Sequence, residues 1–331
     1  MTSQQAGVEL ILDDGTDLAA KINPRLVSLR LTEKREGEAD EFELTLQNAD
    51  GELAVPEPGR VLTLALGWLS GDHVPLGLVD KGRFTIAEVG MEGPPDVVIV
   101  KGQSADLTGP LRQRRTKSWK DTTLGAILRE IARRHGRTAQ IAAGLADLAI
   151  AAIEQEGKSD SALVADLGRR YDAIATWKDG KLIFLPIGQS TNASGVPLAG
   201  ATLRKRDGWR WTFTQAEREN YDGASAQWQD QDAGRRRTVS TGGENRRKLK
   251  RVYATEAEAR QAAQSAKARA GRAPFTFTYD LAIADPHMQP DMRVTLSGWG
   301  PKVDGMAWLV KGLTTDFGPG GLRQSIEMES A

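Results

Sequence analysis

SWKDTTLGAILREIARRHG fills residues 118–136 and has the pattern of one short amphipathic helix. Asp121 or Thr122 can cap its start, because either side chain can accept a hydrogen bond from a free backbone N–H group. The basic residues at 133–135 then meet the carbonyl end, and Gly136 ends the helix. Between these limits, four apolar residues keep the spacing of a single buried stripe: Leu124, Ile127, Leu128 and Ile131.

QEGKSDSALVADLGRRYDAIATWKDGKLIFLP, at residues 155–186, predicts a second helix followed by a hairpin. Ser159 or Asp160 caps a helix whose apolar face consists of Leu163, Val164, Leu167 and Tyr171. Strands at 173–178 and 181–185 then flank Asp179-Gly180, which favours a type I′ turn because both of its central positions take positive φ. The order helix, loop, helix, hairpin therefore predicts a small α/β unit, and it gathers no catalytic or metal-binding side chains.

Strand-rich segments lie on both sides of this unit. Phe42-Glu43-Leu44-Thr45-Leu46 alternates apolar and polar residues, as in a sheet with one buried face. On the N-terminal side we predict a compact antiparallel barrel from strands at 8–12, 27–31, 42–46, 61–68, 84–89 and 97–100. On the C-terminal side we predict strands at 209–213, 224–228, 275–279, 292–296, 308–313 and 325–328.

One more helix is predicted at residues 255–270, among the C-terminal strands. Thr255 and Glu258 have the spacing of a capping box, and Gly271 is a suitable stop. The apolar residues inside are almost all alanine, so this helix can approach a neighbour closely while burying little area. We interpret it as an interface or surface helix.

The glycine-rich residues 318–321 are interpreted as a turn, because neither a Gly-Lys-Ser/Thr sequence nor a helix follows them.

Three segments in this order resemble the phage late control protein D family, which supplies the baseplate hub of contractile phage tails and related tail-like particles. The resemblance is carried by residues 118–136, by residues 155–186 and by the C-terminal run at 290–329, which includes MRVTLSGWGPKVDGMAWLVKGLTTDFGPGGLRQSIEME. It implies an α+β, mainly β fold, with two antiparallel tube-like β-barrel domains flanking a small α/β domain. We place the first barrel at 1–110, the middle domain at 111–194 and the second barrel at 195–331, with helix 255–270 inserted in it.

The function implied by the resemblance is structural. A baseplate hub of this family is a homotrimeric adaptor that joins the hexameric tail tube to the trimeric central spike. The implied partners are other copies of the chain, the tail tube protein and the central spike protein, with the tape-measure protein and the baseplate wedge as further contacts. DNA is implied only as passing cargo. The implied location is the virion tail baseplate, after assembly in the host bacterial cytoplasm. The alternative is a cell-wall-binding or peptidoglycan-cleaving tail module built on the middle domain.

Composition agrees with a structural protein. The chain has 331 residues and no cysteine, which excludes disulfides and thiolate metal sites. Basic and acidic residues both number 44, so no overall charge would recruit nucleic acid or an anionic membrane. No apolar run approaches the length of a membrane span, and the start MTSQQAG lacks the core of a signal peptide. We expect no membrane partner.

Catalytic and metal-binding patterns are weak. The three histidines, His73, His135 and His287, lie in different regions without metal-ligand spacing. We interpret His135 as a helix C-cap. The carboxylate pairs Glu154/Glu156 and Asp13/Asp14 are interpreted as surface charge, because neighbouring residues rarely converge on one substrate bond. We therefore predict no catalytic, cofactor-binding or metal-binding residues.

Two basic clusters and several tryptophans are the candidate contact residues. The first cluster is Arg112, Arg114, Arg115, Lys117 and Lys120; the second is Arg235, Arg236, Arg237, Arg246, Arg247, Lys248, Lys250 and Arg251. Such runs could hold phosphates, but without interleaved aromatic residues they are more typical of a solvated loop or a salt-bridged subunit interface. For residues 235–245 we favour a mobile loop that becomes ordered on docking.

Trp209 and Trp211 alternate with Arg210 on a predicted strand, so both rings share one face. Core packing is the ordinary role of such residues, whereas an exposed aromatic face would mark a contact surface. The candidate interface residues are Arg235, Arg236, Arg237, Arg246, Arg247, Trp209 and Trp211. The segments 71–78 and 235–245 are candidates for contact with the spike or the tube.

Overall fold

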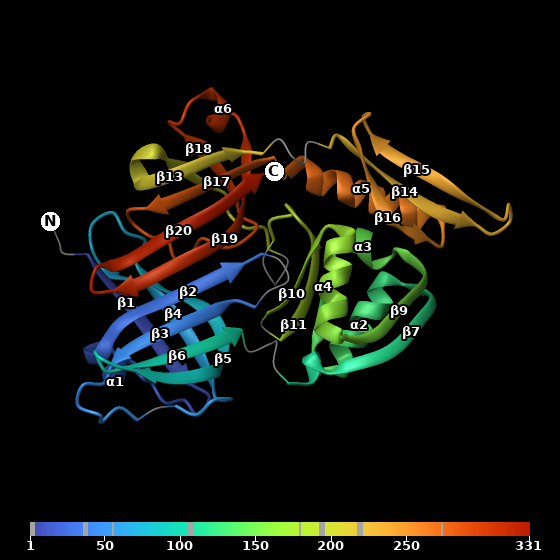
Figure 1. Ribbon diagram of the computed structural model, residues 1–331. Coiled ribbons are helices and arrows are strands. Elements are labelled where there is room, and N and C mark those ends of the chain that lie inside the picture. The colour runs from blue at the N-terminus through green and yellow to red at the C-terminus, as the bar shows by residue number, and fades with distance from the viewer. Residues whose placement is uncertain are drawn as a thin grey trace.

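The computed structural model describes residues 4–35, 39–54, 56–104, 109–178, 180–191, 196–216, 221–272 and 274–331. Figure 1 shows a body built on one large sheet, with a middle α/β unit and an insertion of strands and a helix beside it. In the described part of the chain, no helix is long and apolar enough to span a bilayer.

Six N-terminal strands form the first half of the large sheet. They pair antiparallel in the spatial order β1 (Gln5–Leu12), β4 (Val61–Ser70), β5 (Gly77–Glu92), β6 (Val97–Ser104), β3 (Glu41–Gln47) and β2 (Leu26–Lys34). Each contains one of the strands predicted from the sequence. Their inward residues build one core, to which Leu322 and Ala284 from the C-terminal region also belong. Trp68 Nε1 donates to the carbonyl of Ala284 at 2.9 Å, so the C-terminal region covers one end of this core.

The second half of the sheet consists of C-terminal strands. From β2 the order continues through β19 (Ala307–Gly318), β20 (Gly321–Ser330), β17 (Phe275–Leu281) and β13 (Gly208–Gln215), and β18 (Arg293–Ser297) with β12 (Ala201–Arg204) branches from β19. A separate core centred on Trp308, Phe277 and Tyr279 fills this half. Residues 318–321 form the tight turn between β19 and β20, as predicted.

The layout differs from two separate closed barrels. Strands β2 and β19 pair directly from Leu29↔Phe317 to Lys34↔Gly312, so both halves belong to one twelve-stranded sheet. Arg30 and Asp316, 286 positions apart, form an ion pair across this seam at 2.7 Å. The hydrogen-bonded path through the described residues runs from β1 to β13 and does not close on itself. A pairing so distant in sequence leaves no local pattern, because alternation identifies a strand and not its neighbour.

The middle unit contains the predicted helices and hairpin. Its elements are β7 (Arg114–Thr123), α2 (Leu124–Arg134), β8 (Thr138–Ile141), α3 (Ala143–Ala146), β9 (Ala149–Ser159), α4 (Asp160–Tyr171), β10 (Ala173–Lys178) and β11 (Lys181–Pro186). Ser159 caps α4, as predicted. The cap of α2 is Thr123 and not Asp121 or Thr122, because β7 continues to Thr123. Lys178 pairs with Lys181 across the predicted turn, whose Asp179 lies outside the described residues.

The insertion is larger than the predicted helix. It comprises β14 (Gly223–Asp230), β15 (Arg235–Gly242), β16 (Arg246–Tyr253) and α5 (Glu256–Arg272), placed between the neighbouring strands β13 and β17. The mobile loop predicted at 235–245 is wrong, since most of this segment is β15, paired along its length with β14. Short elements elsewhere are α1 (Ala19–Ile22), η1 (Asn23–Arg25), η3 (Gly109–Arg112), η4 (Lys205–Asp207) and α6 (Pro301–Asp304).

Helix α5 also departs from its predicted role. Its alanines Ala259, Ala262 and Ala263 are buried in a core shared with Ala224 and Ala226 of β14. The helix is thus the inner layer of the insertion, because small side chains let it approach the sheet closely. Thr255 Oγ1 accepts from the N–H of Glu258 at 3.2 Å, but the Glu258 carboxylate accepts from the N–H of Ala151 at 3.0 Å. Half of the predicted capping box is therefore formed.

Two helical glycines allow a test of packing. A Cβ on Gly168 of α4 would lie 2.5 Å from Ala175 Cβ, whereas a Cβ on Gly271 of α5 meets no atom within 4 Å. Gly271 does not stop its helix, which runs to Arg272. We expect Gly168→Ala to lower the free energy of unfolding by about 1–3 kcal/mol through overpacking. Gly271→Ala, the matched control, should raise it by up to about 1 kcal/mol. Urea denaturation measures both, and equal effects would contradict the packing of α4 on β10.

Candidate interaction site

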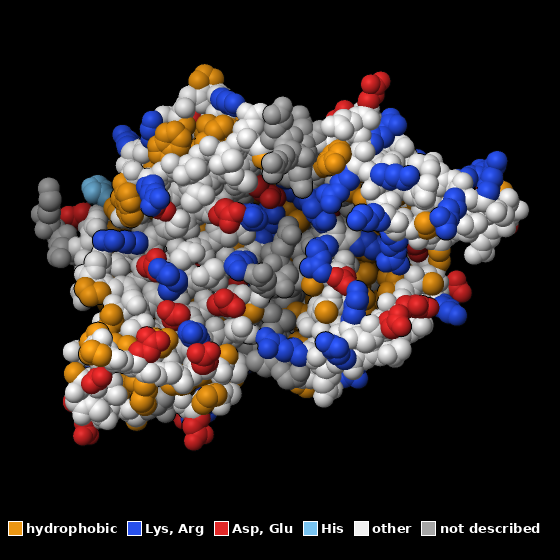
Figure 2. All heavy atoms as spheres, in the orientation of Figure 1, with side chains coloured by type: hydrophobic (Ala, Val, Ile, Leu, Met, Phe, Trp, Pro, Cys, Tyr) orange, Lys and Arg blue, Asp and Glu red, His pale blue; other side chains and the backbone are white. Residues whose placement is uncertain are grey.

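The exposed tryptophans lie on β13, at the end of the large sheet. Trp209 and Trp211 are 57% and 42% exposed. The Trp211 ring stacks on Phe277 with ring centres 6.0 Å apart, and the Lys205 ammonium lies 5.3 Å from the same ring. Figure 2 shows hydrophobic side chains gathered on the surface over β13 and β18. The apolar face of the second core thus continues to the surface at β13, which is the pattern of a contact surface.

Two adjoining hollows extend from Trp209 toward the first half of the sheet. One is lined by Trp209, Trp68 and Gln4, and the other by β1 together with Leu69 and Leu78. Both include Pro319 of the β19–β20 turn. Leu69 is 53% exposed and Leu78, in the predicted contact segment 71–78, is 38% exposed. Sequence analysis singled out the tryptophans and that segment, but it did not predict that the two hollows adjoin at Pro319.

The basic candidates lie elsewhere on the molecule. Arg235, Arg236 and Arg237 are exposed on β15, and Arg246 and Arg247 are exposed on β16. Figure 1 places these strands at the opposite end of the molecule from β13, so the structure does not bring the basic and aromatic candidates together. Figure 2 shows Lys and Arg side chains gathered over the insertion and its border with the middle unit. Arg237 pairs with Asp230 at 2.7 Å.

The first basic cluster is largely occupied by partners within the chain. Lys117 contacts the Glu130 carboxylate, Arg112 donates to Gln103 at 2.7 Å, and Arg115 lies 3.5 Å from Asp160. Carboxylates beside these cations would repel a phosphate backbone. These partners lie within one chain, so the salt-bridged subunit interface stays a prediction.

The histidine of the middle unit belongs to a buried cluster. His135 is the C-cap of α2, as predicted, and its Nε2 lies 2.8 Å from the Asp160 carboxylate. Asp160 is fully buried and also accepts from Arg134 at 2.9 Å and from Gln155 at 2.9 Å. Burial raises the pKa of Asp160, but hydrogen bonds from Gln155, His135 and Arg134 outweigh it and hold the pKa below its usual value. Sequence analysis weighed Asp160 only as a helix cap.

These groups have a structural role. The histidine and the aspartate lie inside the unit, between α2, α4 and β9, where a substrate would have no access. In the described residues, no group of three or more histidine and carboxylate side chains is placed to hold a metal ion. His287 contacts Asp285 within a turn, and Asp13 and Asp14 both pair with Arg60. The carboxylate pair therefore has the surface-charge role that the sequence suggested.

A buried ionic junction connects the three regions of the chain. Glu329 of β20 accepts from Arg35 at 2.6 Å and from Arg272 at 3.0 Å. Arg272 also donates to Asp172, at the end of α4, at 2.5 Å. Asp291 accepts from the N–H groups of Gly188 and Ser190. Burial is the largest influence on Asp291 and raises its pKa. The junction joins β2, the middle unit and the C-terminal strands.

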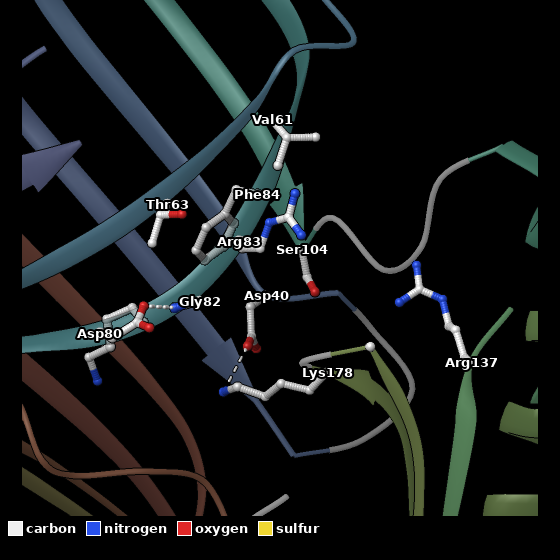
Figure 3. Close-up of a pocket in the computed structure, with 12 residues that line it drawn as sticks. Asp40, Val61, Thr63, Asp80, Gly82, Arg83, Phe84, Ser104, Arg137 and Lys178 are labelled. Atoms are coloured by element: carbon white, nitrogen blue, oxygen red, sulfur yellow. Dashed lines mark hydrogen bonds and ion pairs between the residues drawn. The ribbon is translucent and has the colours of Figure 1, made fainter. Parts of the chain in front are cut away.

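A polar cleft of about 540 Å³ lies beside this junction. Figure 3 shows Asp40 and Lys178 facing each other across it, with their charged atoms 3.6 Å apart, and Arg83 and Arg137 on its walls. Burial raises the pKa of Asp40. The cleft separates the first half of the sheet from the hairpin β10–β11. Its opposite charges hold these two parts together, and we assign it a structural role.

Two curated relatives match nearly the whole chain, whereas no family model matches it. The chain is 32% identical over 361 aligned residues to the "Probable baseplate hub protein" of Escherichia phage P2, which covers 97% of this chain and 92% of the relative. It is 30% identical over 355 residues to the protein of the same name in Escherichia phage 186, with 95% and 90% covered. The chain belongs to the phage baseplate hub family.

Solved structures agree with the fold of this family. A tail protein from Neisseria meningitidis MC58 matches this hub protein with a TM-score of 0.70 at 14% identity, covering 98% of this chain and 96% of the other. The 43 kDa tail protein of prophage MuSo2 from Shewanella oneidensis gives 0.67, with the same identity and coverage. A chain of the Francisella PdpA-VgrG complex gives 0.59 at 7% identity, over 53% of that chain. At these identities, the likeness concerns the fold alone.

Membership in the hub family agrees with the main expectations from the sequence. The hub protein is a mainly β structural component of the phage virion and not an enzyme. In the described residues, the charged groups around Asp160 and around Glu329 are buried and contact partners within the chain. Exposed features of the described residues include an aromatic sheet edge, two hollows that adjoin at Pro319 and a basic insertion. These are features of a protein that acts by contact.

Proposed function

We propose that this hub protein is the homotrimeric adaptor that joins the hexameric tail tube to the trimeric central spike. The observation that carries the proposal is the presence of two separate sheet-bound cores in one chain, one in each half of the large sheet. Three copies would present six such halves toward a sixfold tube, while the opposite face of the ring would keep threefold symmetry for the spike. In this proposal, residues 1–110, 111–194 and 195–331 are the three domains, and the two sheet halves are the tube-like ones.

The candidate interface residues have distinct roles in this proposal. Trp209 and Trp211 form the contact between copies, because large exposed aromatic rings bury more apolar area in a contact than smaller side chains do. Arg235, Arg236, Arg237, Arg246 and Arg247 face outward on the insertion, where they would meet an acidic surface of a baseplate or spike partner. The tape-measure protein and DNA would pass through the ring, and assembly would take place in the host bacterial cytoplasm.

The mass of the purified protein in solution tests this proposal. We expect multi-angle light scattering to give three times the mass of the 35.9 kDa chain, either alone or after addition of the central spike protein of the same particle. Three copies should join through large contacts, of the order of 2,000 Å² or more per interface. A protein that remains monomeric with and without the spike would contradict the trimeric adaptor.

The cell-wall-binding or peptidoglycan-cleaving module on the middle domain is the alternative. A hydrolase needs a carboxylate or histidine within reach of its substrate. The candidate groups of the middle unit, Asp160 and His135, are instead buried against Arg134 and Gln155.

A further inference from the structure

The main path of the twelve-stranded sheet ends at β1 and at β13, while β12 ends the branch through β18, and both β1 and β13 have an open edge. In the described residues, β13 pairs with β17 alone. Strand β1 pairs with β4 on one side, and on the other side residues 16–18 cover only its C-terminal part, through contacts such as Leu18 N–H to the Leu10 carbonyl. Residues 5–9 of β1 and the length of β13 therefore present unpaired backbone groups, which are templates for another strand.

These two edges lack the charges that usually prevent strand addition. Natural proteins place Lys or Arg on free edges. The insertion follows this rule, because its edge strand β15 carries three arginines and its other edge strand β16 carries five basic residues. In contrast, β13 has the single charge Arg210 and β1 has the single charge Glu9. The chain thus places several basic residues on both edges of its small sheet but only one charged residue on each of β1 and β13, although Lys205 and Lys302 lie over the rings of Trp211 and Phe213.

The surroundings of the β1 edge suit a strand with aromatic side chains. The hollow beside residues 5–8 is lined by Leu26, Leu69, Leu78 and Phe317, and none of its lining residues carries a charge. Its volume is about 420 Å³. Trp209 and Trp211 on β13 supply large uncharged rings of the kind that would fill such a space.

The single charges on the two edges are opposite in sign and compatible in position. Antiparallel pairing of Arg210 with Glu9 would set Trp211 opposite Val8 and Phe213 opposite Ala6. Trp211 and Val8 both lie on the core face of their strands, so this register keeps every apolar side chain on the same face. Strand pairing in this register would join opposite charges and apolar surfaces at once.

We propose that β13 of one copy pairs with residues 5–9 of β1 in a second copy, so that the large sheet continues from chain to chain. The contact joins two different surfaces, and repetition around a closed ring leaves neither the β1 edge nor the β13 edge free. This inference rests on the proposed homotrimer and names the contact that builds it.

Two variants that each block one edge test the proposal. Ala6→Lys places a charge on the β1 edge, and Trp211→Lys places one on β13. Analytical ultracentrifugation of each full-length variant alone should show association weaker than wild type by roughly tenfold or more, because each ring contact then meets a blocked edge. An equimolar mixture should form a heterodimer, since the open β13 of Ala6→Lys can pair with the open β1 of Trp211→Lys. Thr238→Lys, on the already charged strand β15, is the matched control and should associate like wild type.

The outcomes separate this contact from the trimer itself. Wild type that is oligomeric, with both variants unaffected, would overturn the edge pairing and leave the adaptor standing. Self-association of Ala6→Lys alone would indicate β13-to-β13 pairing and would also overturn it. A defect in Ala6→Lys but not in Trp211→Lys would show that β1 contacts a surface of the second copy other than β13, and would also overturn the edge pairing. Wild type that is monomeric with and without the spike protein would overturn both proposals.

A charge exchange at the surface covers the case in which Ala6→Lys does not fold. Arg210→Glu and Glu9→Arg alter exposed or partly exposed side chains at the proposed register. Each alone should weaken association, because like charges then face each other. The double variant should restore association toward the wild-type level. Failure of the double variant to restore what the single variants lose would contradict this register.

Discussion

Replacement of Glu329 by glutamine should lower the free energy of unfolding by about 3–5 kcal/mol. The Glu329 carboxylate accepts hydrogen bonds from Arg35 and Arg272, and both guanidinium groups are almost completely buried. Glutamine keeps the shape of the side chain but removes the negative charge. Asp291 would then lie 3.9 Å from the Arg35 guanidinium, and Asp172 would still pair with Arg272. When a buried cation loses its closest partner, the free-energy cost of removing its charge from water is no longer offset by that ion pair.

Glu327→Gln is the matched control for this prediction. Glu327 lies on the same strand, two residues away, and pairs with Lys311 at 2.7 Å with both side chains about half exposed. Such a surface pair contributes at most about 1 kcal/mol. Urea denaturation should therefore separate the two variants clearly. Hydrogen exchange should also rise at the contacts of β20 with the middle unit in Glu329→Gln alone. If the two variants have similar free energies of unfolding, the buried junction does not stabilise the fold more than a surface ion pair does.

The strands of the large sheet were predicted well from the sequence, because the pattern that identifies a strand lies within the strand itself. Strands such as β3 alternate apolar and polar residues, and this pattern is independent of the partner. It could not predict that β2 pairs with β19, since that depends on two segments at opposite ends of the chain. The strands β15 and β16 were missed for another reason. They are rich in basic residues and lack a regular alternation of apolar and polar residues, so only their pairing with β14 identifies them as strands.

The candidate site was predicted in part. The exposed tryptophans were found because an alternating aromatic pair identifies one face of a strand. The ionic junction was missed, although one signal was present: Arg35 of the junction continues the alternation of Leu29, Leu31 and Glu33, which places charged residues in line with core residues. Its partners come from distant segments, so the sequence could indicate a buried charge but not the residues that neutralise it.

Asp160→Asn should destabilise the middle unit by about 3–5 kcal/mol. The carboxylate is fully buried and is hydrogen-bonded to Arg134, His135 and Gln155. These residues come from α2, its C-cap and β9. Asparagine has one acceptor oxygen and no charge, so it cannot satisfy these donors together. Asp166→Asn in the same helix is the control, because Asp166 is partly exposed beside Lys158 and Arg169 and should change stability by at most about 1 kcal/mol.

The pH dependence distinguishes a charge effect from a packing effect at Asp160. The folded protein holds the pKa of Asp160 below its unfolded value of about 3.9, so the carboxylate contributes its full stabilisation above that pH. The contribution is lost as the pH falls through the folded pKa, because protonation then favours the unfolded chain. The difference in unfolding free energy between wild type and Asp160→Asn should therefore be largest near pH 7 and should shrink below roughly pH 4. A difference that stays constant from pH 7 to pH 3 would indicate that the variant acts through packing and that the charge of Asp160 does not stabilise the middle unit.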